Sequence, residues 1–375
     1  MKTTLQVNNA VISWAISRAG FEPNDFFIEY PKARDWVEDI KEPTLPQLRD
    51  FARKVHLPFG YLLLEEPPAE KLPIPFFRTL PGDSGQISLN IRDTIFAFQK
   101  RQDWLRDYLK DQGYDPLLFV GKFSVHSPIK DITTDIKDTL GLPDRWAARF
   151  PNWQKALDYL GEKAEEAGIF ISFNSVVGNN THRPIEVEEC RGFVLTDEYA
   201  PFMFINAADS KSAQMFTIVH ELAHIWIGES AGFDFRHLHP AENDVETFCD
   251  RVAAELLVPK KSFYEEWAKY QNFDSLAKVF KVSQIVIARR ALDLGTISRT
   301  DFFDFYHAHV QRHYQQKEST DGGNFFATLR KRLNLRFMTI VNRAVRENQL
   351  LYRDAYDLTG LRGTTYEKAI NEFQL

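Results

Sequence analysis

The sequence predicts a predominantly helical α+β protein in which a small sheet and two long helices form one domain, with helical regions on either side. Apolar residues recur at helical spacing through most of the chain, whereas three short runs rich in β-branched and aromatic residues lie close together between residues 168 and 206. Hydrophobic residues make up 44% of the 375 residues, so the chain can bury two or three cores of ordinary size.

The first region, residues 1–64, has the pattern of a helix-turn-helix-like bundle. A helix is expected over Asn8–Ala19, and Thr44 can cap another helix whose first turn contains Pro46. A surface that binds DNA usually carries clustered positive charge, but the basic and acidic side chains of this region cancel. We therefore favour a structural or protein-binding role and keep DNA contact as the alternative.

A proline-rich connector and a helix follow over residues 65–114, with the helix expected at Leu89–Gly113. The next domain, residues 115–317, begins with helices at Ile129–Leu140 and Ala156–Gly168. Its three strand-like runs are Gly168–Phe173, Gly192–Leu195 and Pro201–Asn206.

The sequence HELAH at residues 220–224 is the strongest signal of chemistry in the chain, because it lies in an amphipathic helix expected over residues 211–228. On a helix His220 and His224 lie one turn apart on the same side, so both imidazoles can bind one metal ion. Glu221 then projects beside the ion, where a general base for water is needed. The alternative is a chance match on a helix with two unrelated histidines.

A second helix, expected from Asp244 to Pro259, supplies the third ligand that a catalytic zinc site needs. Glu246 is the predicted ligand, and Asp250, one turn further, is expected to accept a hydrogen bond from a ligand imidazole. Glu255 lies about half a turn away and is expected to face solvent. The other candidate donors are in the loop or at the helix end: His237, His239, Glu242 and Asp244.

This donor set predicts a zinc metallopeptidase, since two imidazoles and one carboxylate suit Zn²⁺. Zinc in such a site polarises a carbonyl and lowers the pKa of bound water toward ~7, and Glu221 would pass the proton of that water to the leaving amine. The runs Arg191–Leu195 and Pro201–Asn206 are expected to offer a strand edge to an extended peptide. His237 or His239 could stabilise the oxyanion, but we favour solvated loop residues there.

Four stretches resemble the ImmA/IrrE family of metallopeptidases: RGFVL, INAADS, FTIVHELAHIWIG and ETFCDRVAAELLVP. The resemblance implies a zincin-like catalytic domain with His220, His224 and Glu246 as zinc ligands and Glu221 as the base. Cys249 and Asp250 stand where family members more often have alanine and asparagine.

The segments PTLPQLRDFARK, PFGYLLLEEPP and LPIPFFRT also resemble family members with a repressor-like N-terminal domain. Phe76 stands where such proteins often have aspartate. The resemblance implies regulatory proteolysis of a repressor or another regulator, in a mobile-element, stress or toxin–antitoxin setting. A protein substrate or partner, such as a repressor or a toxin, is therefore expected.

Residues 275–295 have the spacing of a second helix-turn-helix, in which Ser283 caps the second helix. Its basic residues are Lys278, Lys281, Arg289 and Arg290. We favour a role in packing, with DNA contact as the alternative. Residues 325–375 form a C-terminal helical region, with a solvated basic face and a buried stripe of Leu329, Leu333, Phe337, Ile340, Val341 and Ala344.

The net charge of -6 gives no general attraction to nucleic acid or to an anionic membrane. The two cysteines, Cys190 and Cys249, provide no disulfide framework, and neither a signal peptide nor a membrane-spanning segment is evident. We expect a cytoplasmic protein. The leading hypothesis is a zinc endopeptidase, and the alternative is a non-catalytic DNA-binding or antitoxin-like regulator that retains a zinc site.

Overall fold

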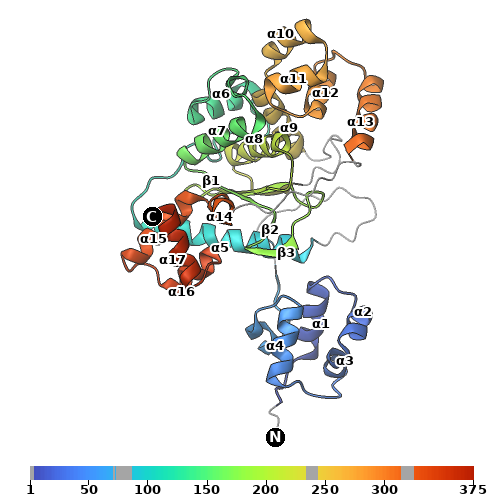
Figure 1. Ribbon diagram of the computed structural model, residues 1–375, viewed down its shortest axis with the longest axis vertical. Coiled ribbons are helices and arrows are strands. Elements are labelled where there is room, and N and C mark those ends of the chain that lie inside the picture. Colours follow the sequence, from blue (N-terminus) through green and yellow to red (C-terminus); the bar gives the residue numbers. More distant parts are fainter. Residues whose placement is uncertain (1–3, 71, 73–86, 234–243, 314–324) are drawn as a thin grey trace. The chain divides into compact units, whose positions relative to one another are not determined.

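The structure, a computed structural model, describes five stretches of the chain: residues 4–70, 72, 87–233, 244–313 and 325–375. It divides into two compact units, of which unit 1 comprises residues 1–73 and 82–95, and unit 2 comprises residues 74–81 and 96–375 (Figure 1). Helix α5 (Leu89–Asp111) contributes its first turns to unit 1 and the rest to unit 2. Most of the proline-rich connector predicted before α5, Phe76 included, lies outside the described residues.

Unit 1 is a bundle of short helices: α1 (Asn9–Arg18), α2 (Pro23–Glu29), α3 (Pro31–Val37), α4 (Leu45–Lys54) and the 3-10 helix η1 (Phe59–Leu63). The predicted cap of α4 is confirmed, because Thr44 and Gln47 form a reciprocal capping box. Phe51 of α4 packs edge-on against Phe26 and Trp36, with ring centroids 5.8 and 5.6 Å away. The many phenylalanines of the sequence thus serve as core residues here.

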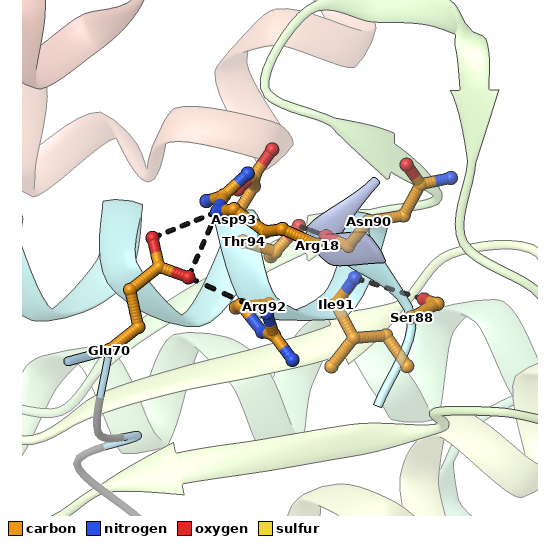
Figure 2. Close-up of polar contacts among 8 residues, drawn as sticks. All are labelled: Arg18, Glu70, Ser88, Asn90, Ile91, Arg92, Asp93 and Thr94. Atoms are coloured by element: carbon orange, nitrogen blue, oxygen red, sulfur yellow. Dashed lines mark hydrogen bonds and ion pairs between the residues drawn. The ribbon is translucent and has the colours of Figure 1, made fainter. Parts of the chain in front are cut away.

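Arg18, at the end of α1, is held inside unit 1 by two carboxylates (Figure 2). Its Nε lies 2.9 Å from both carboxylate oxygens of Glu70, and its Nη2 lies 2.9 Å from Oδ1 of Asp93 in α5. Only 6% of the Arg18 side chain is exposed. Since its charge is neutralised within the unit, Arg18 is removed from the basic residues that a DNA phosphate could contact.

The main sheet of unit 2, as far as the residues are described, has the strand order β1 (Phe170–Asn174), β5 (Phe202–Asn206), β4 (Gly192–Leu195) and β6 (Ala231–Phe233). Strand β1 is parallel to β5, and β4 is antiparallel to both of its neighbours. A separate hairpin joins β2 (Val176–Val177) and β3 (Asn180–Pro184).

The prediction that Arg191–Leu195 and Pro201–Asn206 offer a free strand edge is wrong. Strand β5 lies between β1 and β4, and β4 is covered on its other side by β6. Within the described residues the edges of this sheet are therefore β1 and β6. Strand β6 escapes sequence reasoning because it is only three residues long and exists through pairing with Gly192–Val194, almost forty residues earlier in the chain.

The two faces of the sheet pack against different helices (Figure 1). One face is covered by α6 (Ile129–Leu140), α7 (Trp153–Glu166), α8 (Lys211–Ile227) and α9 (Asp244–Leu257), and the short helix η2 (Trp146–Arg149) precedes α7. The other face packs against α5, where Phe98 lies 5.2 Å from Phe193 and 5.6 Å from Phe204. Their neighbours Val194 and Met203 point into the opposite core, as strand alternation requires.

The fold class predicted from the sequence, helical α+β with a small sheet and two long helices, is confirmed. None of the helices in the described part of the chain combines the length and the apolar composition that a membrane crossing requires.

After α9 come α10 (Lys260–Tyr270), α11 (Phe273–Phe280), α12 (Gln284–Asp293) and α13 (Arg299–His313). The hydroxyl of Ser283 accepts a hydrogen bond from the backbone N–H of Val286, which confirms the predicted cap between α11 and α12.

The basic side chains of this helix-turn-helix-like segment have partners within the protein. Arg290 donates from Nε to the carbonyl of Val258 at 3.0 Å and pairs through Nη2 with Glu255. Glu255, expected to face solvent, is thus only partly exposed. The other three contacts are Lys278 with Asp274, Arg289 with Asp293, and Lys281 with the carbonyl of Lys278. These contacts favour the packing role over DNA contact.

The C-terminal region consists of α14 (Phe325–Leu333), α15 (Leu335–Arg346), α16 (Tyr352–Thr359) and α17 (Thr364–Phe373). The predicted apolar stripe is buried, but Asn334 divides it between α14 and α15. Asn334 has a left-handed φ of 61°, caps α15 through Phe337 N–H, and donates to Glu165 Oε1 at 2.7 Å and the Ile171 carbonyl at 3.0 Å.

Two side chains of the basic face predicted for this region are exposed, as expected, and also contact the rest of unit 2. Lys331 pairs with Asp158 at 3.0 Å, and Arg336 donates to the carbonyl of Glu165 at 2.7 Å. Asp158 and Glu165 both lie on α7, whose acidic residues thus face the basic start of the C-terminal region. Part of the local excess of positive charge thus has acidic or carbonyl partners at the surface of unit 2.

A half-buried carboxyl, that of Glu165, should make stability depend on pH. Burial raises the pKa of Glu165 to about 7, although the charges of Arg336 and Arg330 and the hydrogen bond from Asn334 act to lower it. Because the folded pKa exceeds the ordinary value of 4.5, the folded state binds more protons between these values, and stability falls as pH rises through this window. Glu165→Gln should therefore stabilise the protein by about 1–3 kcal/mol near pH 8 and have little effect near pH 4.

Urea unfolding of the Glu165→Gln variant at both pH values measures this difference. The matched control is Glu162→Gln, which removes an exposed carboxylate from the same helix and should change stability by less than about 0.5 kcal/mol. An equal gain at both pH values in Glu165→Gln would contradict the burial of an ionised carboxylate as the cause.

Candidate metal centre

Helix α8 carries the HELAH sequence through the middle of unit 2. It begins at Ser210, whose hydroxyl accepts from Ala213 N–H, and it ends at Gly228, whose φ of 75° is left-handed. Every residue from Gln214 to Ile227 is buried. A Cβ added at Gly228 would lie 3.0 Å from the Cα of Gly121, so this end of α8 packs backbone to backbone.

Donor atoms of three side chains, two from α8 and one from the neighbouring α9, lie close together. The Nε2 atoms of His220 and His224 are 3.1 Å apart, and Glu246 places Oε2 3.1 Å from the first and Oε1 3.4 Å from the second. In a tetrahedral site with bonds of ~2.0 Å, adjacent ligand atoms are about 3.3 Å apart. The distance between the two nitrogens, and that from each nitrogen to one oxygen of Glu246, are therefore close to the edge of a zinc tetrahedron.

Asp250 lies behind His220, with its Oδ1 3.0 Å from the ring Nδ1. A carboxylate here favours the tautomer in which Nδ1–H donates to Asp250, which leaves the lone pair of Nε2 directed at Glu246 and His224. Such an arrangement needs a positive charge between the donors, supplied either by a proton or by a metal ion.

The pKa values of His220 and Glu246 also favour a positive charge between the donors. Burial lowers the pKa of His220, but hydrogen bonds and charges of Asp250 and Glu246 outweigh it and raise the pKa to about 10. Burial raises the pKa of Glu246, but hydrogen bonds and charges of the two histidines lower it to about 2. The group binds one positive charge tightly.

Glu221 lies beside this group, completely buried. Neither of its carboxylate oxygens has a hydrogen-bond partner among the described residues, and the same holds for His224 Nδ1. Burial, and then the charge of Glu246, raise the pKa of Glu221 to about 8, with His220 acting to lower it. Buried carboxylate oxygens without partners are costly, so they indicate a ligand or substrate that completes the site. The donor set thus fits a metal ion.

The sequence alone did not indicate a role for Gly192, which was noted only as one residue of the stretch RGFVL. A Cβ on Gly192 would lie 2.5 Å from Thr217 Cγ2, 2.9 Å from the Phe204 carbonyl oxygen and 3.5 Å from Glu221 Oε1. The first residue of β4 therefore crosses α8 in direct contact, next to the predicted base. Its glycine is required by the close approach of a strand to a helix.

Sequence reasoning also gave no role to Cys249. Its Sγ and ligand nitrogens of His220 and His224 all lie within 4.8 Å of one another, and its side chain is completely buried. Burial, followed by the charges of Glu246, Glu221 and Asp250, raises the pKa of the thiol well above its usual value. The third ligand beside the two histidines could thus be Glu246 or Cys249. We favour Glu246, because its distances to the histidine nitrogens are close to the edge of a tetrahedron.

Of the remaining candidate donors, only Asp244 lies among the described residues. Asp244 is exposed at the first residue of α9. His237, His239 and Glu242 lie outside the described residues, and with them both candidates for stabilising an oxyanion.

Residues 164–292 match the family model of the IrrE N-terminal-like domain, which belongs to the peptidase M78 family. The match covers about a third of the 375 residues, from the end of α7 to α12, and contains every residue of the candidate centre. This segment is a metallopeptidase-type domain. Residues 334–372 match a family described as a domain of unknown function, DUF8813, and no curated protein matches the chain.

Proposed function

We propose that this protein is a zinc-dependent endopeptidase that cuts a protein regulator. The observation that carries the proposal is the buried convergence of His220, His224 and Glu246, with Asp250 behind one imidazole and the partnerless carboxylate of Glu221 beside it. The match to a metallopeptidase family over the same residues supports it.

The roles of the side chains follow from their positions. His220, His224 and Glu246 would hold the ion, which when bound polarises the scissile carbonyl and activates water. Asp250 fixes the His220 ring by accepting its Nδ1–H. Glu221 accepts the proton of the attacking water on a carboxylate oxygen and delivers it to the nitrogen of the leaving amine. Its burial shields this proton transfer from bulk solvent.

An extended peptide would pair with β6, which follows β4 and is an edge of the sheet as far as its residues are described. Strand β6 begins three residues after Gly228, the residue that ends α8, so the edge and the helix with the base are linked by a short connection. Backbone pairing of this kind binds a peptide with little regard to sequence, and specificity comes from side-chain pockets. A protein regulator such as a repressor or a toxin partner, in a mobile-element, stress or toxin–antitoxin setting, is the substrate class that we propose.

Zinc content tests the centre directly. Asp250→Ala should weaken zinc binding by about 10–100-fold, because the His220 ring loses the partner that sets its tautomer and orientation. Zinc bound by the purified protein, titrated against a chelator, measures this loss. The control is Asp244→Asn, an exposed aspartate on the same helix, which should bind zinc like the wild type. Unchanged affinity in Asp250→Ala contradicts its assigned role, and a wild type that binds no zinc contradicts the centre.

The second candidate is a non-catalytic DNA-binding or antitoxin-like regulator that retains the zinc site. The helix-turn-helix-like pair α11 and α12 motivates it, but Arg290 is nine-tenths buried against Val258 and Glu255, which disfavours contact with DNA. Retained biological function in a Glu221→Gln variant would favour this candidate over the peptidase.

A further inference from the structure

A third side chain of α9 faces the metal centre. Cys249 follows Glu246 by three residues, so both lie on the side of α9 that also carries Asp250. The sulfur is completely buried, and it lies within 4.8 Å of ligand nitrogens on His220 and His224. The centre therefore contains four side chains with donor atoms suited to zinc, whereas a hydrolytic site needs three.

We propose that Cys249 is a fourth protein ligand of this metal ion, which closes the site when its sulfur is bound and opens it to water when the sulfur withdraws. The proposal rests on the metal centre of the proposed function. A second observation supports a ligand at this point, because both carboxylate oxygens of Glu221, completely buried beside the donors, have no partner among the described residues.

The closed and the open state differ in whether the sulfur of Cys249 or a water molecule is bound to the metal. When the sulfur binds, the S–H bond breaks, the proton leaves to solvent, and a sulfur lone pair forms the bond to the metal. Four protein ligands are typical of structural zinc sites, whereas catalytic sites keep one position for water. The closed state would thus bind metal more tightly, and Glu221 would have no activated water to deprotonate.

Two states of one site provide a form of regulation that needs no further domain. Whatever moves α9 by a small distance relative to α8, including a bound substrate, changes the balance between sulfur and water at the ion. Thiolate is also a soft donor, so Cys249 should increase the preference of the centre for soft ions such as Cd²⁺.

Cobalt spectroscopy of the full-length protein tests the proposal without relying on activity. Wild-type protein loaded with Co²⁺ should show visible bands of a four-coordinate ion together with a near-ultraviolet thiolate-to-cobalt charge-transfer band. Cys249→Ala and Cys249→Ser should lose the charge-transfer band and keep the visible bands. Cys190→Ala is the matched control, since Cys190 is also completely buried but lies outside the donor group, and it should keep both.

Metal preference gives a second measurement. The ratio of Cd²⁺ to Zn²⁺ affinity should fall at least about 10-fold in Cys249→Ser, a substitution that keeps the size and polarity of the side chain, and should stay unchanged in Cys190→Ala. Identical cobalt spectra and affinity ratios in wild type and Cys249→Ser would overturn the role of Cys249 and leave the peptidase centre intact. A wild type that binds neither Co²⁺ nor Zn²⁺ would overturn both.

Discussion

Replacing Glu221 by glutamine should lower peptide-bond hydrolysis by about 10²–10⁴-fold, the usual contribution of a positioned general base. Glutamine keeps the shape of the side chain but cannot take the proton of the attacking water. The zinc content should not change, because Glu221 lies beside the three donors and is not one of them. The expected loss therefore lies in the chemical step and not in the assembly of the site.

The first substrate to test is a repressor or toxin whose gene neighbours that of this protein, if one is found there, with fragments identified by mass spectrometry. Zinc-loaded wild type, Glu221→Gln and Glu229→Gln should be compared at equal concentration. Glu229 is an exposed carboxylate just beyond the end of the same helix, so its variant should cleave like the wild type. Equal cleavage by wild type and Glu221→Gln would remove Glu221 from the role of base.

Gly192→Ala should be among the most destabilising single-methyl additions in this protein, at a cost of about 1–3 kcal/mol. The new Cβ would lie 2.5 Å from Thr217 Cγ2 and 2.9 Å from the backbone oxygen of Phe204, so β4 or α8 must shift. Because the same Cβ would be 3.5 Å from Glu221 Oε1, the shift would also displace the predicted base. A loss of hydrolysis should accompany the loss of stability.

Denaturant unfolding of the apoprotein separates these effects from metal binding. Gly161→Ala is the control, since a Cβ there meets no atom within 4 Å, and alanine in a helix is favoured over glycine by roughly 0.5–1 kcal/mol. Thr217→Ser removes the closest clashing methyl group and keeps the hydroxyl that bonds to Ala213. The double variant with Gly192→Ala should recover part of the stability. A Gly192→Ala variant as stable as the wild type would contradict the close approach of β4 and α8.

Much of the centre could be predicted because it depends on local geometry. His220 and His224 are one helical turn apart whatever surrounds them, and Glu221 must then lie beside them. The same reasoning along α9 placed Glu246 and Asp250 on one face, and the structure brings both to the imidazoles. Helix caps at Thr44 and Ser283 could likewise be predicted, since a cap satisfies backbone groups only three residues away.

The sequence by itself thus determined the helices, their buried faces and the donors that each helix presents, because these depend on residues within a few positions of one another. Only the tertiary structure decided that β6 covers β4, that Glu255 binds Arg290, that Gly192 lies against Thr217 and that Cys249 lies near the histidines. Each of these contacts joins segments distant in the sequence or depends on how two helices pack. The spacing of apolar residues along the sequence does not predict such contacts, because they depend on how the whole core packs.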